Sequence, residues 1–283
     1  MSLREQTSWP IWLPSAAAMA LLAATLLFSR CPTPMRVATL NLENYPKHDR
    51  QGPAAMALIE DLGVAAVALQ EITQPERLAA QARESLGPHW RFAWTNVGSR
   101  QRVGVLYDGS RLQVIDEIVH RETLLHRGAK PAYEVVVQPI GGGAPLHLIT
   151  VHLKARDSGQ PIRAKQLAAL RPILKQRMEE GKRVVLMGDL NSTGEADRRL
   201  LDTLARDAEM SWGSRGLPCT SYWARKDGCL GFALDHVISW AAPRAVDVGG
   251  ACESDGCRPG EQCPIYYGEI SDHCPVIVDL PTW

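Results

Sequence analysis

The sequence predicts an α/β fold in which two β-sheets pack against each other and helices cover their outer faces. Apolar runs with the length of buried strands recur from residue 36 to the C-terminus, and only a few segments show a helical pattern. Many strands with few helices are typical of two packed sheets. The chain has 283 residues, 45% of them hydrophobic, which is ample for a large core. No repeat or second linker follows residue 36, so we expect one domain there.

The first elements alternate between strand and helix. A buried strand is predicted at 36–42, and a helix at 53–62 has Pro53 at its start, where proline is tolerated. A second apolar strand at 64–71 ends in an acid, and a second helix is predicted at 75–86. Short β-rich runs separated by Gly, Pro and Asp turns follow at 91–95, 102–107, 112–120, 133–140 and 146–153.

The remaining elements return to the mixed pattern. A long helix is predicted at 161–180, and Pro172 inside it indicates a kink or a break. The three glycines at 141–143 lie between two strand-like runs and are interpreted as a hairpin turn. Further strands are predicted at 183–190, 233–239, 244–250 and 274–280, with a helix near 195–207 between the first two.

The N-terminal segment differs from the rest of the chain. Residues 9–28 carry no charge and would span roughly 30 Å as a helix, which is enough to cross a bilayer. We expect an uncleaved membrane anchor, with a cleaved signal peptide or an amphipathic or core helix as alternatives. The flanking charges are too balanced to predict the orientation. The predicted organisation is therefore an anchor or signal segment with a linker at 1–35, followed by a catalytic domain at 36–283.

The charge balance restricts the function. The 31 basic and 31 acidic residues give a formal net charge of +0. This balance argues against a protein that grips nucleic acid mainly through a basic surface. It does not exclude an enzyme that contacts only a few phosphates.

The cysteines indicate an oxidising compartment. Apart from Cys31, the six cysteines all fall in the last third of the chain, at positions 219, 229, 252, 257, 263 and 274. An even number in loops behind an export-like segment predicts disulfides outside the cytoplasm, in the periplasm or beyond. A zinc site is the competing interpretation, although the cysteine spacings at 252–263 are not those of paired CxxC motifs. Pairing of Cys219 with Cys229 is plausible by proximity, and the remaining connectivity is open.

Polar residues follow the apolar run at 184–187. Asp189 and Asn191 come where the apolar run ends, in the stretch Gly-Asp-Leu-Asn. Ser192 and Glu195 fit a capping box for the following helix. The capping box leaves Asp189 unexplained, so this carboxylate is a candidate functional group.

The same design recurs at other strand ends. Each case alone has an ordinary interpretation, since an acid can lie in a solvated turn and a histidine can pack as a hydrogen-bonded residue. Active sites of sheet proteins collect at strand ends, so we expect these side chains to converge. The residues are Asn41, Glu43, Glu71, His152, Asp235, His236, Asp272 and His273.

This set of side chains suits phosphate-ester hydrolysis. Carboxylate and amide oxygens without a cysteine ligand favour a hard cation, Mg²⁺ or Mn²⁺. Histidines near acids provide general acid–base chemistry near neutral pH. Together they fit the attack of water on a phosphate ester beside a metal ion. The chain has no GxSxG motif, no Walker A loop and no GxGxxG motif behind a strand.

Six segments in order resemble the endonuclease/exonuclease/phosphatase superfamily. They are N-L-E-N, L-Q-E, T-V-H-L-K, G-D-L-N, L-D-H-V and S-D-H-C-P-V, and the resemblance covers about residues 36–281. The superfamily includes pancreatic-type deoxyribonuclease, abasic-site endonucleases, neutral sphingomyelinases and inositol polyphosphate 5-phosphatases. The resemblance implies a four-layer α/β/β/α sandwich of two mixed sheets flanked by helices. It also implies a metal-dependent phosphodiester hydrolase.

The resemblance implies a metal site on the acids. Glu71 would be the principal Mg²⁺ ligand, with Asn41 beside it. Asp272 would support this metal or a second one. Glu43 stands where some family members carry a metal-binding Asp, so its role is open.

The resemblance also implies the catalytic groups. His273 would activate the attacking water and Asp235 would orient it. Asp189 and Asn191 would hold the water and a phosphate oxygen, and His152 would contact the phosphate or assist the leaving group. Members of the family differ in whether the final histidine or the aspartate of the G-D-x-N motif is the base, and we assign the base to His273.

Other polar residues lie near these motifs. Arg163 and Gln166 in the long helix are expected to be structural. His236 could reach the site but is expected to pack or cap. Arg127 and Lys130 either bind phosphate or lie in a solvated turn.

The substrate remains open among three hypotheses. An extracytoplasmic nuclease is favoured because short loops would leave a site open to a polymer. A sphingomyelinase-like or other small phosphodiesterase is the alternative, since an anchor at 9–28 would hold the site near a bilayer. The sequence shows no clear exposed aromatic hairpin for lipid binding, and 221–223 is a weak candidate. A binding module without activity is disfavoured because no matched catalytic position is missing. No obligate protein partner is inferred.

Overall fold

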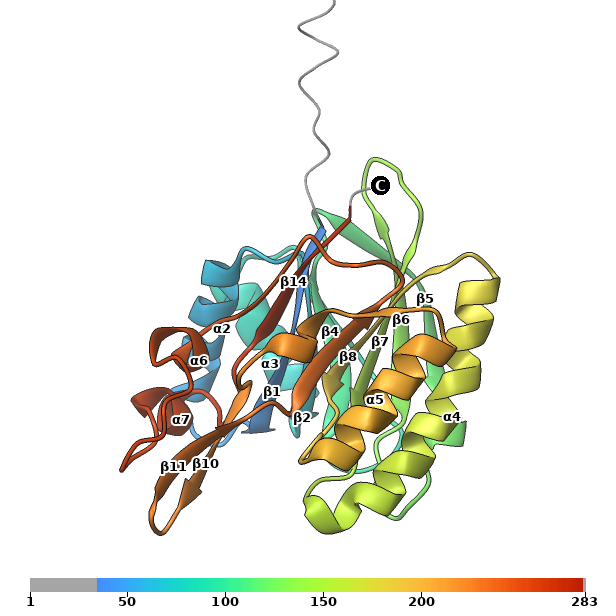
Figure 1. The fold of residues 1–283 in the computed structure, drawn as a ribbon. Coiled ribbons are helices and arrows are strands. Elements are labelled where there is room, and N and C mark those ends of the chain that lie inside the picture. Colours follow the sequence, from blue (N-terminus) through green and yellow to red (C-terminus); the bar gives the residue numbers. More distant parts are fainter. Residues whose placement is uncertain (1–34, 282–283) are drawn as a thin grey trace, which may run out of the picture. The chain divides into compact units, whose positions relative to one another are not determined.

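The structure, a computed structural model, describes residues 35–281. Two six-stranded mixed sheets pack face to face, and helices lie on their outer faces (Figure 1). The first sheet contains, in spatial order, β13 (Ala245–Val248), β14 (Val276–Leu280), β1 (Met35–Tyr45), β2 (Ala66–Ile72), β4 (Arg102–Asp108) and β3 (Trp90–Trp94). The second contains β5 (Leu112–His120), β6 (Ala132–Pro139), β7 (Leu146–His152), β8 (Arg183–Asp189), β12 (Asp235–Ser239) and β9 (Ser211–Trp212).

The two outer layers are helical. The first sheet is covered by α2 (Gln51–Leu62) and α3 (Pro75–Ser85), and the second by α4 (Gln160–Glu179) and α5 (Glu195–Asp207). The smaller elements are the hairpin β10 (Ser221–Arg225) and β11 (Gly228–Phe232), the short helices α6 (Ala251–Ser254) and α7 (Ile265–Glu269), and the 3-10 turns η1 (Arg121–Thr123), η2 (Asp157–Gly159) and η3 (Gly213–Gly216). The predicted four-layer sandwich is therefore confirmed.

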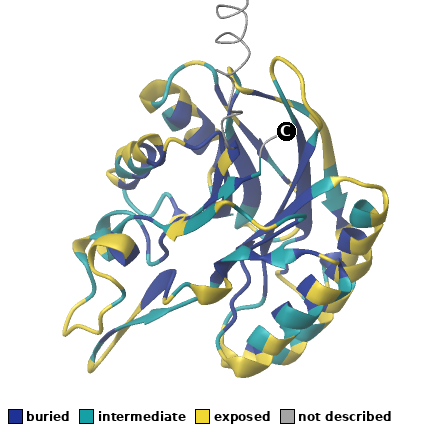
Figure 2. Ribbon diagram, turned by 45° about the horizontal axis from the view of Figure 1, so that its top comes forward, coloured by how far each residue is buried: buried dark blue, intermediate teal, exposed yellow. Residues whose placement is uncertain are grey.

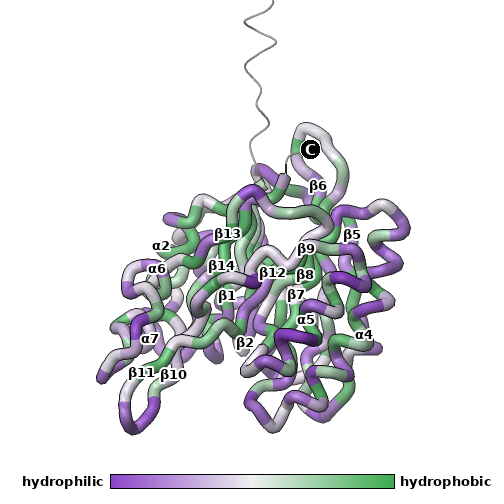
Figure 3. The backbone as a smooth tube through the Cα atoms, viewed as in Figure 1, coloured by the Kyte–Doolittle hydropathy of each residue, from purple (hydrophilic) through white to green (hydrophobic). Residues whose placement is uncertain are grey.

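In the inner strands, successive side chains point alternately to the core between the sheets and to the covering helices. In β8, Val185 and Met187 face the core between the sheets, whereas Val184 and Leu186 face α4 and α5. Both faces of this sheet are covered, so the strand is a continuous apolar run. The central strands of both sheets are accordingly buried in Figure 2 and largely hydrophobic in Figure 3, and the outward faces of the helices are exposed.

The predicted strands and helices are all present, with boundaries shifted by a few residues. Of the kink or break expected at Pro172, the break is wrong, because α4 is continuous across it. Proline removes the hydrogen bond to the carbonyl of Ala168. Ala168 and Pro172 are both exposed, so water can satisfy this carbonyl. The glycines at 141–143 do connect an antiparallel pair, β6 and β7.

The β10–β11 hairpin and the helices α6 and α7 were not predicted. They lie in the part of the chain with three disulfides, Cys219–Cys257, Cys229–Cys263 and Cys252–Cys274. The expected pairing of Cys219 with Cys229 is wrong. Cys229 lies opposite Ala224 in the hairpin, and Cys219 precedes Ala224 by five residues, about 17 Å of extended strand.

The predicted membrane anchor at 9–28 lies outside the described residues. Between residues 35 and 281, no helix has the length and apolar character needed to cross a membrane.

Candidate active site

Strand ends from both sheets meet at one place. The Asn41 side chain, near the end of β1 in the first sheet, donates from Nδ2 to Asp189 Oδ2 over 3.1 Å, and Asp189 ends β8 in the second sheet. The same Nδ2 lies 3.3 Å from Glu71 Oε1 at the end of β2. The expected convergence of polar strand ends is therefore present in the structure.

Three adjacent strands of the second sheet bring polar residues to this place. Asp189 is the last residue of β8, and its register partners are His152 at the end of parallel β7 and Asp235 at the start of antiparallel β12. Gly188 allows the close approach, since a Cβ there would lie 2.1 Å from the carbonyl oxygen of Val151. Its φ of +146° also favours glycine.

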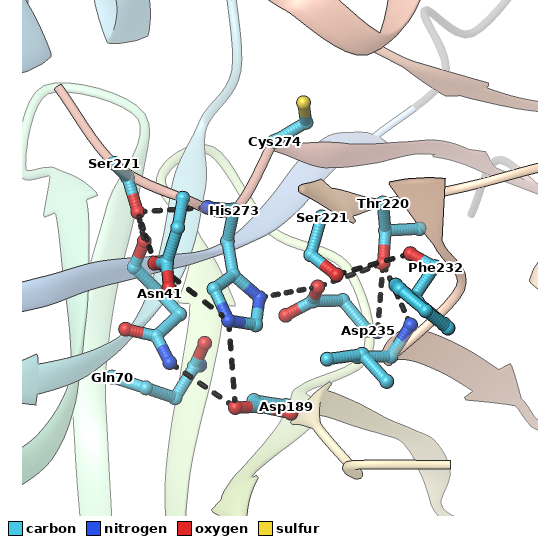
Figure 4. A network of polar contacts seen from close by, with 12 residues as sticks. Asn41, Gln70, Asp189, Thr220, Ser221, Phe232, Asp235, Ser271, His273 and Cys274 are labelled. Atoms are coloured by element: carbon cyan, nitrogen blue, oxygen red, sulfur yellow. Dashed lines mark hydrogen bonds and ion pairs between the residues drawn. The ribbon is translucent and has the colours of Figure 1, made fainter. Parts of the chain in front are cut away.

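His273 and Asp235 form a buried hydrogen-bonded pair, called here the dyad. His273 Nδ1 lies 2.7 Å from Asp235 Oδ2 (Figure 4). Thr220 Oγ1 donates to the same carboxylate oxygen over 2.8 Å and accepts the backbone N–H of Asp235 over 2.9 Å. The other imidazole nitrogen, Nε2, lies 3.9 Å from Asp189 Oδ2 and 3.9 Å from Asp272 Oδ1. The dyad thus directs Nε2 toward a pair of carboxylates.

Glu71 is aimed by an irregularity in the first sheet. The β2–β4 pairing shifts register between Leu69 and Ile72, and Glu71 has a left-handed φ of +60°. Such bulges re-aim side chains and occur next to active sites. Glu71 Oε2 accepts hydrogen bonds from the Asn44 backbone N–H at 3.1 Å and from Gln101 Nε2 at 2.7 Å. Gln101 was not predicted, because it lies in the loop between β3 and β4.

Glu43 links the end of β1 to the segment that carries His273. Its Oε2 pairs with Lys47 Nζ and accepts the backbone N–H of Asp272 over 3.1 Å. Ser271 Oγ donates to the Asn41 carbonyl oxygen over 2.6 Å. These contacts hold the segment that carries His273 against the end of β1.

The carboxylates of the site lie close together, and their negative charges repel one another. Burial raises the pKa of Asp189 to about 7; the positive charge of His273 opposes this, and the charges of Asp235 and Glu71 add to it. Burial also raises the pKa of Asp272 to about 6, again opposed by His273 and reinforced by Glu71. A cation near these groups would relieve this repulsion.

The two histidines have opposite shifts. Burial lowers the pKa of His273, but the charges of Asp235 and Asp189 outweigh it and hold that pKa well above its usual value. Burial, reinforced by the charge of Lys130, lowers the pKa of His152 well below its usual value. His152 Nε2 lies 3.4 Å from Asp189 Oδ2. A neutral His152 can donate a hydrogen bond without adding charge.

The donor set fits a hard divalent cation. Asp189 and Asp272 form ion pairs with histidines. The side chains of Glu71 and Asp272 are 16% and 30% exposed to solvent. Asn41 Oδ1 accepts the Glu43 backbone N–H, which leaves it a second lone pair. Oxygen donors of this kind suit Mg²⁺ or Mn²⁺. One possible ligand atom from each of Asp189, Asp235 and His273 also lies within 4.8 Å of the other two. However, Nδ1 of His273 is already used in the dyad hydrogen bond.

Two expectations next to the site are settled by the hydrogen bonds. The capping box is wrong, because α5 begins after Gly194 without a side-chain cap and Ser192 Oγ donates to the Ala233 carbonyl. His236 packs away from the site, where its Nε2 contacts Ser192 Oγ at 2.6 Å and its Nδ1 lies 3.3 Å from Trp212 Nε1. Burial lowers the pKa of His236 to about 3, so it stays neutral.

Asn191 lies beside Asp189 with a left-handed φ of +51°. Its backbone N–H donates to Asp189 Oδ1 over 2.9 Å, and its side-chain Nδ2 donates to the Leu153 carbonyl over 3.2 Å. The side chain is therefore held in place. Contact with a phosphate oxygen remains a prediction for this residue.

The basic candidates separate into two kinds. Arg163 is fully buried and binds both carboxylate oxygens of Asp197, which confirms a structural role. Arg127 is exposed in a turn. Lys130 is half-buried; burial lowers its pKa, and the charges of Glu71 and Asp189 raise it. Lys130 is thus a basic side chain whose charge acts on the site.

A family model described as the endonuclease/exonuclease/phosphatase family matches residues 38–273. No curated protein sequence matches the chain. Among solved structures, TDP2 of D. rerio complexed with single-strand DNA product is 17% identical, with a TM-score of 0.64, covering 86% of this chain and 97% of that one.

Two further solved structures are similar. The human Nocturnin catalytic domain with bound sulfate is 15% identical, with a TM-score of 0.63 and coverage of 88% and 95%. A mannosyl-6-phosphatase of Bacteroides thetaiotaomicron is 13% identical, with a TM-score of 0.63 and coverage of 87% and 99%. At these identities the likeness shows a shared fold.

Proposed function

The chain belongs to the endonuclease/exonuclease/phosphatase family, and on that premise we propose that it is a Mg²⁺-dependent phosphodiester hydrolase that cleaves nucleic acid. One observation carries the proposal. Asp235, Asp189 and Glu71 come from three different strands, and they meet His273, from the segment before β14, in one small volume. A base beside clustered carboxylates is the arrangement needed to direct water at a phosphate.

The dyad supplies the base. Asp235 holds Nδ1 of His273, so Nε2 of the neutral imidazole is the nitrogen available to take a proton from water. A cation bound to the neighbouring acids would offset the charges that raise the pKa of His273 and so favour this neutral form. The water oxygen then bonds to phosphorus, the bond to the leaving oxygen breaks, and the proton resides on Nε2. Asp235 stabilises the imidazolium that forms. Asp189 is proposed to orient the water, because its Oδ2 lies 3.9 Å from Nε2.

Three residues of the chain would hold the metal. Glu71 is the proposed principal ligand, with Asn41 and Asp272 beside it. When bound, Mg²⁺ or Mn²⁺ would screen the charge of the phosphate and stabilise the leaving oxygen. His152 lies near Glu71 and Asp189, so it is proposed to hydrogen-bond the phosphate or assist the leaving group.

Nucleic acid is the proposed substrate because a structural neighbour, TDP2 of D. rerio, is complexed with a single-strand DNA product. A balanced net charge fits an enzyme that grips a few phosphates near the site rather than a long basic surface.

A lipid phosphodiester is the second candidate, and one observation favours it. The sequence showed no clear exposed aromatic hairpin, but the structure has an exposed tryptophan on the β10–β11 hairpin. Trp223 on β10 is 60% exposed, whereas Tyr222 beside it is buried. Trp223 lies opposite Leu230 and near the Phe232 ring at 5.9 Å. Exposed tryptophan suits a membrane interface.

The proposed location is outside the cytoplasm. Three disulfides support an oxidising compartment. Anchoring through residues 9–28 is proposed from the sequence alone. Protease protection of the full chain in intact and permeabilised cells would test both features.

A substrate panel tests the proposal. The full chain with Mg²⁺ would be given supercoiled plasmid, single-stranded RNA and sphingomyelin vesicles, each with and without EDTA. Cleavage of plasmid or RNA that stops with EDTA supports the proposed nuclease. Turnover of sphingomyelin alone would make the lipid candidate correct, and EDTA-resistant cleavage would contradict the metal site.

A further inference from the structure

Two segments that pair with each other hold the dyad. His273 lies in one segment, and Thr220, which binds the Asp235 carboxylate, lies in the other. The backbone N–H of Cys274 donates to the Thr220 carbonyl over 2.7 Å, and a β-bridge joins Ser221 to His273. Figure 4 shows the two segments on either side of the Asp235 carboxylate. A shift between them would change the dyad hydrogen bond directly.

Two disulfide-bonded cysteines flank this pairing. Cys274 follows the histidine of the dyad directly and is bonded to Cys252. Cys219 precedes the threonine directly and is bonded to Cys257. Both partner cysteines lie within the segment 252–257, so the two bonds tie both segments to one short stretch. We call these two bonds the dyad disulfides.

Among the described residues, few aliphatic side chains pack around the dyad disulfides. Their cluster contains six cysteines with buried Tyr222 and Ala251, and the partly buried Val248, Tyr266 and Tyr267 pack against it. The Tyr222 hydroxyl donates to the Ala251 carbonyl over 3.1 Å, and the Tyr266 hydroxyl donates to the His273 carbonyl over 2.9 Å. The three larger apolar clusters between and outside the sheets contain no cysteine. A cluster with so few apolar side chains depends on covalent links for its order. Opening the dyad disulfides would therefore loosen the paired segments and leave the sheets folded.

We infer that the dyad disulfides position His273 against Asp235, so that hydrolysis requires both bonds to be closed. The inference rests on the proposed function, because it assigns the dyad to the chemical step. Displacement of catalytic groups by about 1 Å lowers a rate by about 10²-fold, so a loosened dyad would act mainly on kcat.

The third disulfide provides a matched control. Cys229–Cys263 links β11, the outer strand of the same hairpin, to the loop before α7. Neither cysteine is adjacent to a residue that contacts the dyad. The Cys229–Cys263 bond joins residues 34 positions apart in the sequence, and the dyad disulfides join residues 22 and 38 positions apart. Its removal should destabilise the same region without displacing His273.

The test compares two double variants of the full chain, C252S/C274S and C229S/C263S, with bis-p-nitrophenyl phosphate and Mg²⁺. We expect kcat of C252S/C274S to fall by about 10-fold to 10²-fold with KM within about twofold, and kcat of C229S/C263S to stay within about twofold of the wild type. Thermal unfolding midpoints should fall in both. Equal kcat in the two variants, whether unchanged or equally reduced, would overturn the inference.

If C252S/C274S does not fold, reduction of the wild type tests the inference instead. Dithiothreitol converts each disulfide to two thiols and is itself oxidised, and thiol counts report how many bonds have opened. We expect kcat to fall while far-UV circular dichroism is retained, and to return on reoxidation. Full kcat with all three bonds open would overturn the inference.

A substrate-free readout separates the inference from the proposed function. The Nδ1 proton of His273, hydrogen-bonded to a carboxylate, should give a downfield proton NMR signal that disappears in C252S/C274S and persists in C229S/C263S. Persistence in C252S/C274S would overturn the inference, whatever the activity. If the oxidised wild type hydrolyses no phosphodiester while this pattern is seen, the proposed function fails and the positioning stands.

Discussion

The Nδ1 atom of His273 lies 2.7 Å from Oδ2 of Asp235, although 38 residues separate them along the chain. The pair is buried, and Thr220 adds a hydrogen bond to the same carboxylate oxygen. This geometry fixes which imidazole nitrogen faces the carboxylates Asp189 and Asp272. The predictions that follow begin from this pair.

Asp235→Asn should lower kcat by about 10²-fold or more and change KM little, because the amide cannot stabilise the imidazolium. Steady-state kinetics with bis-p-nitrophenyl phosphate and Mg²⁺ measure the effect. Thr220→Val is a second variant on the same oxygen and should show a smaller loss. A kcat of Asp235→Asn equal to the wild type would remove Asp235 from the mechanism.

Glu71→Gln should raise the Mg²⁺ concentration for half-maximal activity by about tenfold or more, because a neutral amide replaces the proposed principal ligand. A Mg²⁺ titration of activity measures this. Glu122→Gln, a change to an exposed acid in η1, serves as the control and should match the wild type. An unchanged titration in Glu71→Gln would show that the metal binds elsewhere.

Lys130→Ala should raise KM for a phosphodiester by about tenfold with a smaller change in kcat, because it removes a positive charge that acts on the site. Arg127→Ala, an exposed turn residue of the same loop, is the matched control and should leave KM unchanged. Equal KM values in the two variants would assign Lys130 to a structural role.

A buried ion network outside the site should set the acid stability. Glu134 is fully buried and binds His120 Nε2 at 2.7 Å, His147 Nδ1 at 2.5 Å and Arg177 Nε at 2.9 Å. Burial raises the pKa of Glu134, but the hydrogen bonds from its three partners outweigh it and hold that pKa well below its ordinary value of 4.5. The stabilisation is therefore present above pH 4.5 and is lost as the pH falls below it.

Glu134→Gln should lower the free energy of unfolding at pH 7 by about 3 kcal/mol, because it leaves the buried partners without their carboxylate. The variant should also lose less stability than the wild type between pH 5 and pH 3, as measured by urea unfolding. Identical pH dependence in the two proteins would show that the network does not control acid stability.

Strand ends were predictable because a buried apolar run must stop where a polar side chain is needed. Asp189, Glu71 and His152 each follow such a run, and all three contact one another or Asn41 in the structure. The arrangement of two packed sheets also followed from the many strand-length apolar runs and the few helical segments. The sequence could thus indicate the place of the site before its geometry.

The support around the site was less predictable. Thr220 and Gln101 lie in turns whose partners are distant in sequence, and no local pattern marks them. Asp235 and His236 are neighbours, yet successive side chains on a strand point to opposite faces, so only Asp235 enters the site. The cysteine pairing depends on how the hairpin folds, which sequence proximity did not reveal.

The most direct test of the account is the hydrolysis of bis-p-nitrophenyl phosphate by the wild type and by His273→Ala, with Mg²⁺ and with EDTA. We predict Mg²⁺-dependent turnover by the wild type and a kcat lower by about 10²-fold or more in His273→Ala at an unchanged circular dichroism spectrum. A His273→Ala variant with full Mg²⁺-dependent activity would contradict the account.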